Sequence, residues 1–374
     1  MDQLTLTLPR WWDLHAHFRQ DKLCAPLLKA HYDMGCAGIL AMPNTQPPVS
    51  KVSESEDSDG WSIEGYRNML LAAGGDKFAD IIVPLYLTKD TTPAMIDAGA
   101  KKGLLRACKY YPPHGTTGAE HGQPFSVFME NGVFAAMEEN NVILCVHGEE
   151  HGMKTEEYFS RNTNAEEFFY KARMPRAIDK FPALKIVAEH VTTRAAVDLV
   201  SRAGNNIAAN ITPQHLIYTV SHLLRGLKYH LYCLPLVKWE EDREALRRAV
   251  ISPGNTKFFA GTDSAPHAKK ATSCGCAAGC YTGGVAPQLY AEAFELAGAD
   301  LSKTDAQAAF KKFLCVNGPA FYGLPVAKDT FDLEKKEQSV EILRAPGGDI
   351  IPLPVGMQID DPLGGKAAIP WSIR

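Results

Sequence analysis

Two histidines stand two residues apart near the start of the chain, in the segment Asp13-Leu14-His15-Ala16-His17. On a β-strand, residues i and i+2 point to the same face, so both imidazoles can reach one cation. As nitrogen ligands they would stand about 2.0–2.1 Å from a zinc ion. Such pairs also arise by chance, and the spacing becomes informative only if neighbouring strands end in similar side chains.

Further side chains of the metal-binding type end other apolar runs. His147 ends the run 142–147, His190 ends the run 184–190, and Asp263 ends the run 257–263. A single histidine in such a place is commonly a hydrogen-bonded core residue, and a single aspartate is commonly a loop cap. Imidazoles combined with a carboxylate, however, form the usual ligand set of a divalent metal. Together with His15 and His17, these residues predict a metal centre.

Lys109 also follows an apolar run, 104–108, but its chemistry is different. It could extend its amine to solvent at the rim of the fold. Alternatively, burial and nearby cations could keep the amine neutral. A neutral amine can add carbon dioxide to form a carbamate, whose two oxygens can bridge two metal ions. The residues alone leave both interpretations open.

The elements that must position these residues are eight short apolar runs, most of them followed by a helical pattern. Continuous apolar runs are typical of strands buried on both faces. In the helical pattern 192–203, Thr192 or Thr193 can cap the N-terminus. Strands alternating with helices predict an α/β fold, a (β/α)₈ TIM barrel, over residues 1–325. The Pro- and Gly-rich segment 326–374 is predicted to be a short C-terminal extension packed on the barrel. The eight runs are 11–17, 38–43, 81–87, 104–110, 142–147, 184–190, 206–212 and 257–263.

Six of the eight runs end in, or are followed by, polar or ionisable side chains. One of these side chains, Asn44, has not been named above and directly follows the run 38–43. In this architecture, active sites lie at the C-terminal ends of the strands. The sequence therefore predicts that these side chains converge at one mouth of the barrel.

The composition limits the classes of partner. The 374 residues are 45% hydrophobic and 22% charged, and the formal net charge of -4 provides no basic surface for nucleic acid or an anionic membrane. Residues 1–10 show no signal pattern, and no apolar run approaches the roughly 18 residues of a membrane span. The nine cysteines are scattered, and Cys108, Cys145 and Cys233 lie in apolar runs. We therefore expect a cytoplasmic enzyme with thiols kept reduced and a small-molecule substrate.

The order of these residues resembles the amidohydrolase superfamily in its two-metal form, and the finer motifs resemble the dihydroorotase family of the single-function, bacterial type. The motifs cover residues 11 to 325, and their joint occurrence by chance is negligible. Besides the His15-Ala16-His17 pair, they are Met42-Pro43-Asn44, Pro47-Pro48-Val49, Lys109-Tyr110-Tyr111-Pro112, Thr116-Thr117, Val146-His147-Gly148-Glu149, Glu189-His190-Val191-Thr192-Thr193, Ile211-Thr212-Pro213-Gln214-His215-Leu216, Tyr232-Cys233-Leu234-Pro235, Gly261-Thr262-Asp263-Ser264-Ala265-Pro266-His267, Asn317-Gly318-Pro319 and Phe321-Tyr322-Gly323-Leu324-Pro325.

The resemblance implies a ligand set and a reaction. His15, His17, Asp263 and Lys109, carboxylated to N6-carboxylysine, would hold one Zn²⁺, and Lys109, His147 and His190 would hold a second. A bridging hydroxide would attack the cyclic amide of L-dihydroorotate, giving N-carbamoyl-L-aspartate in a reversible step of pyrimidine biosynthesis. Asp263 would act as general base and then general acid. A homodimer is also a family expectation.

The resemblance also implies substrate contacts. Arg19 has the fork geometry for the carboxylate of the substrate. The other implied contacts are His17, Asn44, Thr116, Thr117, His147, Leu234, His267 and the backbone amide of Ala278. Thr116 and Thr117 would form the tip of a loop that closes on the substrate.

Some positions depart from the family pattern, and alternatives remain. Gln20 stands where an acidic residue is common, and Gly118 stands where asparagine is common. One extra alanine in the segment 276–280 means that Ala277 could replace Ala278 as the substrate contact. Cys274, Cys276 and Cys280 could suggest a zinc site, but their spacing lacks a repeated CxxC pair.

Two other functions compete with a dihydroorotase, and the metal itself is open. The first is another cyclic amidohydrolase, such as a hydantoinase or an allantoinase. The second is a barrel without catalytic activity that serves as a scaffold. The ligand types also accept cobalt, manganese or iron.

Overall fold

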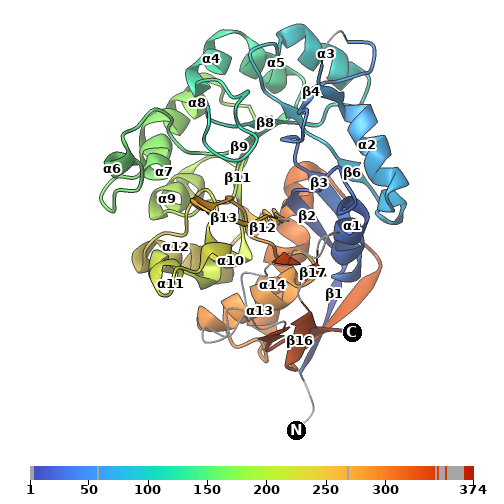
Figure 1. Cartoon of the computed structure of the whole chain (residues 1–374), viewed down its shortest axis with the longest axis vertical. Helices are drawn as coiled ribbons and strands as arrows, with labels where there is room; N and C mark the ends of the chain where they lie inside the picture. Colours follow the sequence, from blue (N-terminus) through green and yellow to red (C-terminus); the bar gives the residue numbers. More distant parts are fainter. Residues whose placement is uncertain (1–3, 57–58, 268, 342, 345–349, 352–365) are drawn as a thin grey trace.

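Parallel strands form the centre of the molecule in the computed structural model, which describes residues 4–374 except 57–58, 268, 342, 345–349 and 352–365. They pair in the orders β2-β3-β6 and β7-β8-β9-β10-β11-β12 (Figure 1). Each of the eight predicted runs overlaps at least one of them. The strands are β2 (Trp11–Ala16), β3 (Cys36–Ala41), β6 (Ile81–Ile82), β7 (Leu85–Tyr86), β8 (Ala107–Tyr110), β9 (Ile143–Val146), β10 (Ile186–Ala188), β11 (Ile207–Ile211) and β12 (Phe258–Ala260).

Two joints turn these strands into a closed barrel. Beyond β12, the Asp263 amide donates to the carbonyl of His15 at 2.8 Å, and the His17 amide donates to the carbonyl of Ser264 at 2.9 Å. At the other joint, the predicted strand 81–87 is split into β6 and β7. Pro84 lies in the gap and has no N–H to donate to a neighbouring strand. The prediction of a TIM barrel is confirmed, with its third strand broken at this proline.

Helices surround the strands, as the predicted alternation requires (Figure 1). Thr193 caps α9, since its side chain accepts a hydrogen bond from the Ala196 amide. Among the described helices, none is long and apolar enough to cross a membrane. The α-helices are α1 (Cys24–Asp33), α2 (Ile63–Ala72), α3 (Pro93–Lys101), α4 (Phe125–Glu130), α5 (Val133–Glu139), α6 (Thr155–Tyr158), α7 (Ala165–Phe168), α8 (Met174–Lys180), α9 (Arg194–Arg202), α10 (Pro213–Ile217), α11 (Val220–Leu224), α12 (Glu240–Ile251), α13 (Ala286–Leu296), α14 (Thr304–Lys311) and α15 (Asn317–Tyr322).

The interior of the barrel changes from apolar to polar along the strands. Ala107, Cys145 and Val187 belong to one buried apolar cluster that forms the floor. The residues two positions further along these strands share the same face, and they are Lys109, His147 and Glu189. The strands thus place a polar set directly above an apolar floor.

The first barrel strand, β2, also carries a polar side chain above the apolar floor, but its pairing with β3 is irregular. Trp12 and Leu14 belong to the floor, whereas Ala16 belongs to the outer cluster between strands and helices. The pairing of β2 with β3 shifts register between Asp13 and Ala16. A register shift of this kind changes the direction in which side chains point. It occurs at the place where the side chain of His15 points into the mouth of the barrel.

The N-terminal strand β1 (Thr5–Pro9) lies outside the barrel and pairs with residues near the C-terminus. It forms an antiparallel sheet with β15 (Thr330–Glu334) and β20 (Ser372–Ile373). Trp371 is fully buried, and its indole N–H donates to Glu295 of α13 at 3.1 Å. The boundary near residue 326 stays a prediction, since part of the predicted extension lies outside the described residues.

Candidate metal and active site

Three of the predicted ligands meet where the barrel closes. The Nε2 atoms of His15 and His17 lie 3.3 and 2.9 Å from the same oxygen, Oδ1 of Asp263. Their possible ligand atoms all lie within 4.8 Å of one another. In the described part of the chain, this is the one group of three or more His, Cys, Asp or Glu side chains that meets this limit. The cysteines at 274, 276 and 280 do not form such a group.

The other two predicted histidine ligands lie on the adjoining wall. The ring of His190 lies 5.0 Å from the ring of His15 and 4.7 Å from that of His147, measured between centroids. Lys109 is fully buried beneath this wall and does not line the pocket itself. The structure therefore brings all six predicted ligands to one end of the barrel.

Unsatisfied polar atoms test whether this site fits a metal. Within the described residues, His15 Nε2, Lys109 Nζ and His190 Nδ1 are buried without a hydrogen-bond partner. A buried polar atom left unpaired costs about 1–3 kcal/mol, so three such atoms facing one region call for an external partner. Imidazole nitrogens and a carboxylate are ligands that divalent metals accept. The residues fit a metal site.

The electrostatics keep these groups in the forms that a cation requires. Burial lowers the pKa of the Lys109 amine, which favours its neutral form. Burial and the neighbouring His147 hold the pKa of His190 well below its usual value, so its ring stays neutral. Burial alone would raise the pKa of Asp263, but the neighbouring imidazoles of His15 and His17 hold that pKa well below its usual range. Asp263 is therefore a carboxylate at neutral pH.

Two glutamates to which the sequence analysis gave no role orient the histidines. Glu189 accepts a hydrogen bond from Nδ1 of His15, and Glu149 lies 2.8 Å from Nε2 of His147. Carboxylates of this kind fix the tautomer and orientation of metal-binding imidazoles. Both stand in the motifs quoted above, next to His190 and two residues after His147. Their positions were visible in the sequence, but their partners were not.

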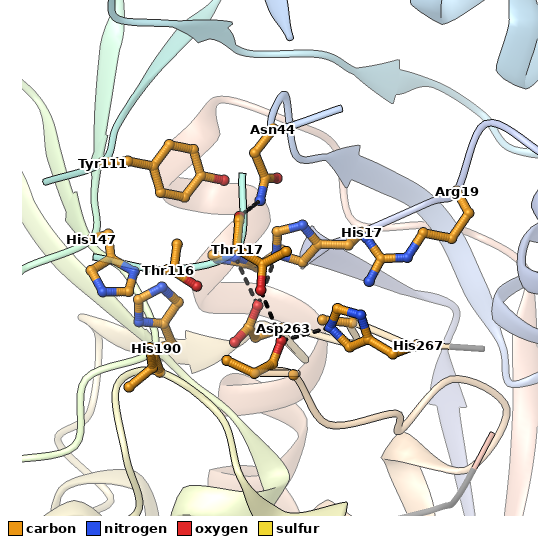
Figure 2. A pocket seen from close by; sticks show the side chains of 15 residues that line it. His17, Arg19, Asn44, Tyr111, Thr116, Thr117, His147, His190, Asp263 and His267 are labelled. Atoms are coloured by element: carbon orange, nitrogen blue, oxygen red, sulfur yellow. Dashed lines mark hydrogen bonds and ion pairs between the residues drawn. The ribbon is translucent and has the colours of Figure 1, made fainter. Parts of the chain in front are cut away.

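The pocket in front of these ligands contains the predicted substrate contacts (Figure 2). Tyr111, Ala265 and Gly279 line it as well, although the sequence analysis did not name them as site residues. The lining residues are His15, His17, Arg19, Asn44, Tyr111, Thr116, Thr117, His147, His190, Leu234, Asp263, Ala265, His267, Ala278 and Gly279.

The loop tip at Thr116 and Thr117 lies across this pocket. The Asn44 side chain donates to the carbonyl of Thr117 at 2.9 Å, and the hydroxyl of Thr117 lies 3.5 Å from the carbonyl of Ala278. Gly118 has φ +74°, in the left-handed region that glycine and asparagine adopt most readily. Glycine therefore suits the backbone conformation that the loop adopts at this position.

A hairpin, β13 (Ala271–Thr272) and β14 (Gly275–Cys276), precedes the Ala277–Ala278 pair. The Ala277 amide donates to the carbonyl of Lys270 at 2.8 Å, whereas Ala278 lines the pocket. Because the Ala277 amide is already engaged, this geometry favours Ala278 of the two alternatives.

Lys270 holds this segment in place, and the sequence analysis did not identify it. Its side chain is 4% exposed, and its ammonium donates to the carbonyls of Tyr232, Ala277 and Gly279 at 2.6, 2.5 and 2.6 Å. The first of these carbonyls lies two residues before Leu234, and the other two flank Ala278. One buried cation therefore ties together both backbone segments that line this side of the pocket.

A closed parallel barrel with this ligand set at its C-terminal mouth defines a metal-dependent amidohydrolase. No family model matches the chain. Curated relatives named dihydroorotase match over nearly their full length: that of Acaryochloris marina is 39% identical and covers 96% of this chain and 98% of the relative. The dihydroorotase of Halorhodospira halophila is 41% identical, and the match covers 94% of this chain and 96% of that relative. The chain belongs to the dihydroorotase family.

Solved structures agree with this assignment. The dihydroorotase of Saccharomyces cerevisiae, solved in complex with 5-fluoroorotic acid, has a TM-score of 0.81 and 29% identity, and the match covers 100% of this chain and 99% of that one. A D-hydantoinase from Thermus sp. has a TM-score of 0.69 at 13% identity, and the match covers 99% of this chain and 82% of that one. It shares the fold.

Replacing Lys270 by Met removes the ammonium that donates to the carbonyls of Tyr232, Ala277 and Gly279. We expect the free energy of unfolding to fall by about 3 kcal/mol, as measured by urea denaturation, and the amides of residues 276–279 to exchange faster with deuterium. The neighbouring exposed residue provides a matched control, Lys269→Met, which should change neither quantity. Equal stability and exchange in the two variants would refute the role of Lys270.

Proposed function

We propose that this pocket catalyses the reversible hydrolysis of L-dihydroorotate to N-carbamoyl-L-aspartate, and ring closure in the direction of pyrimidine biosynthesis. One observation carries the proposal: a single pocket joins a metal-ligand set to Arg19, Asn44 and His267. The first set suits hydrolysis of an amide, and the second suits recognition of a carboxylate. The near full-length similarity to curated dihydroorotases supports the same reaction.

We further propose a site for two Zn²⁺ ions, with other divalent metals as substitutes. His15, His17, Asp263 and Lys109 would hold one, and Lys109, His147 and His190 the other, with Lys109 carboxylated on its amine. The burial of Lys109 and the lowered pKa of its amine support this modification, because only an uncharged amine adds carbon dioxide. When bound, such ions lower the pKa of water and polarise the carbonyl under attack.

Asp263 is the proposed general base and general acid. Its carboxylate is ionised and lies in the pocket against both first-strand histidines. It can therefore accept the proton of the attacking water and deliver it to the leaving amide nitrogen. The left-handed φ of +48° at Asp263 is costly for a residue other than glycine, and such strain is typical of a side chain held for function.

The remaining pocket residues would bind the substrate. Arg19 donates through Nε to the carbonyl of Pro266 at 2.7 Å, which anchors the side chain while its terminal N–H groups can bind the carboxylate. Asn44 and His267 would complete that contact. Leu234 and Ala278 would offer backbone groups to the polar edge of the ring, and Thr116 and Thr117 would cover it.

We also propose that the protein is cytoplasmic, works as a homodimer, and binds neither nucleic acid nor membrane. The acidic net charge of -4 supports the last point. The scaffold alternative is disfavoured because all six predicted ligands are present and lie at one end of the barrel. A hydantoinase or allantoinase would have less use for the Arg19, Asn44 and His267 group.

The choice of substrate can be tested directly with purified, zinc-loaded protein. We expect turnover of L-dihydroorotate, and a kcat/KM at least about 100-fold lower for hydantoin and allantoin, because neither offers the ring carboxylate that Arg19 binds. Arg19→Gln should lower kcat/KM for dihydroorotate about 100-fold. The exposed Arg161, which pairs with Glu241, supplies the control Arg161→Gln. Activity on hydantoin alone would contradict the proposal.

The role of Lys109 can be tested by Lys109→Ala. We expect kcat to fall by at least about 1,000-fold, and the metal content measured by atomic absorption to fall with it. Small carboxylates such as acetate should restore part of the activity, since they can replace the carbamate. Lys101→Ala, at the exposed end of α3, should behave as the wild type. Normal turnover in Lys109→Ala would refute the bridging role.

A further inference from the structure

Tyr111 lines the pocket directly after β8, two residues beyond Lys109. Its side chain is 1% exposed. Figure 2 shows its hydroxyl pointing into the pocket, toward the side chain of Asn44. It thus lies on the wall between the metal-ligand end, marked by His147, and the Asn44 end.

The hydroxyl of Tyr111 is buried, and among the described residues it has no hydrogen-bond partner. A tyrosine side chain ends in a phenolic hydroxyl, which is a hydrogen-bond donor. Leaving a buried donor unpaired is unfavourable. A phenylalanine would fill the same space without that penalty, so the hydroxyl stabilises nothing that the structure describes.

The ring of Tyr111 is fixed from three sides, so the position of the hydroxyl is fixed as well. The ring of Tyr86 packs edge-on against it at 5.0 Å, and the ring of His147 lies 6.2 Å away, both measured between centroids. The amine of Lys109 lies 5.0 Å from its centre. A donor held in this way loses little conformational freedom when a ligand arrives.

We propose that Tyr111 is a further substrate-binding residue, whose hydroxyl donates a hydrogen bond to a ring carbonyl oxygen of the bound cyclic amide. The inference rests on the proposed function, because it takes the substrate from there. A ring carbonyl is the matching acceptor, since Tyr111 lies between the group that suits the carboxylate and the group that suits the reacting amide. The contact also satisfies the one polar atom of Tyr111 that the protein leaves unpaired.

The test compares Tyr111→Phe with Tyr110→Phe. Tyr110 is the adjacent buried tyrosine, but its ring packs on Phe125 and Phe169, away from the pocket. We expect Tyr111→Phe to lower kcat/KM for dihydroorotate about tenfold and to weaken binding of 5-fluoroorotic acid, an analogue with ring carbonyls, by a similar factor. Tyr110→Phe should stay within twofold of the wild type in both measurements.

Stability and metal content separate a binding role from a structural one. In Tyr111→Phe, the zinc content should equal that of the wild type, and the midpoint of urea denaturation should be unchanged or higher, because no protein contact is lost. Activity and binding within twofold of the wild type would overturn the inference, and so would a loss of activity that follows a loss of zinc or stability. If the wild-type protein does not hydrolyse dihydroorotate, the proposed function fails. The ratio of the affinities of Tyr111→Phe and the wild type for 5-fluoroorotic acid then still decides the role of Tyr111.

Discussion

The joint between the first and last strands of the barrel is the constraint on which the site depends. Backbone hydrogen bonds from Asp263 to His15 and from His17 to Ser264 close the barrel there. Beneath them, the buried carboxylate of Asp13 accepts hydrogen bonds from the amide and the hydroxyl of Thr262, at 3.0 and 2.6 Å. These contacts bring together proposed metal ligands that lie about 250 residues apart, so the fold must close before the proposed metal site can form.

Stability and function oppose each other at this mouth. His190 and Asp263 have left-handed backbone conformations, with φ of 39° and 48°. Several buried polar atoms around them have no partner among the described residues. Each feature costs free energy in the isolated protein. The apolar floor beneath them and the buried carboxylates beside them, Glu189 and Asp13, keep these unfavourable features in place.

The sequence predicted the parts of the fold and site that depend on local pattern. Apolar runs ending in His, Lys or Asp located the strands and the mouth, because parallel strands share one C-terminal edge. The missing N–H of Pro84 favours a break in the strand, but the continuous hydrophobicity of the run predicts one unbroken strand.

The local pattern does not predict the roles of Glu189 and Lys270, because each role depends on a partner distant in the chain. Glu189 meets His15, and Lys270 meets the carbonyl of Tyr232. The role of Tyr111 is equally invisible in the sequence, because it depends on a buried hydroxyl that has no hydrogen-bond partner among the described residues. The choice between Ala277 and Ala278 likewise depended on which amide the preceding hairpin uses.

Anomalous scattering at the zinc edge, from crystals of the zinc-loaded protein, tests the central claim most directly. The account predicts two peaks: one among His15, His17 and Asp263, and one beside His147 and His190. Between them, it predicts electron density for a carboxyl group on the amine of Lys109. A single peak with an unmodified Lys109 would contradict the two-metal site, and the absence of any peak would contradict the metal centre as a whole.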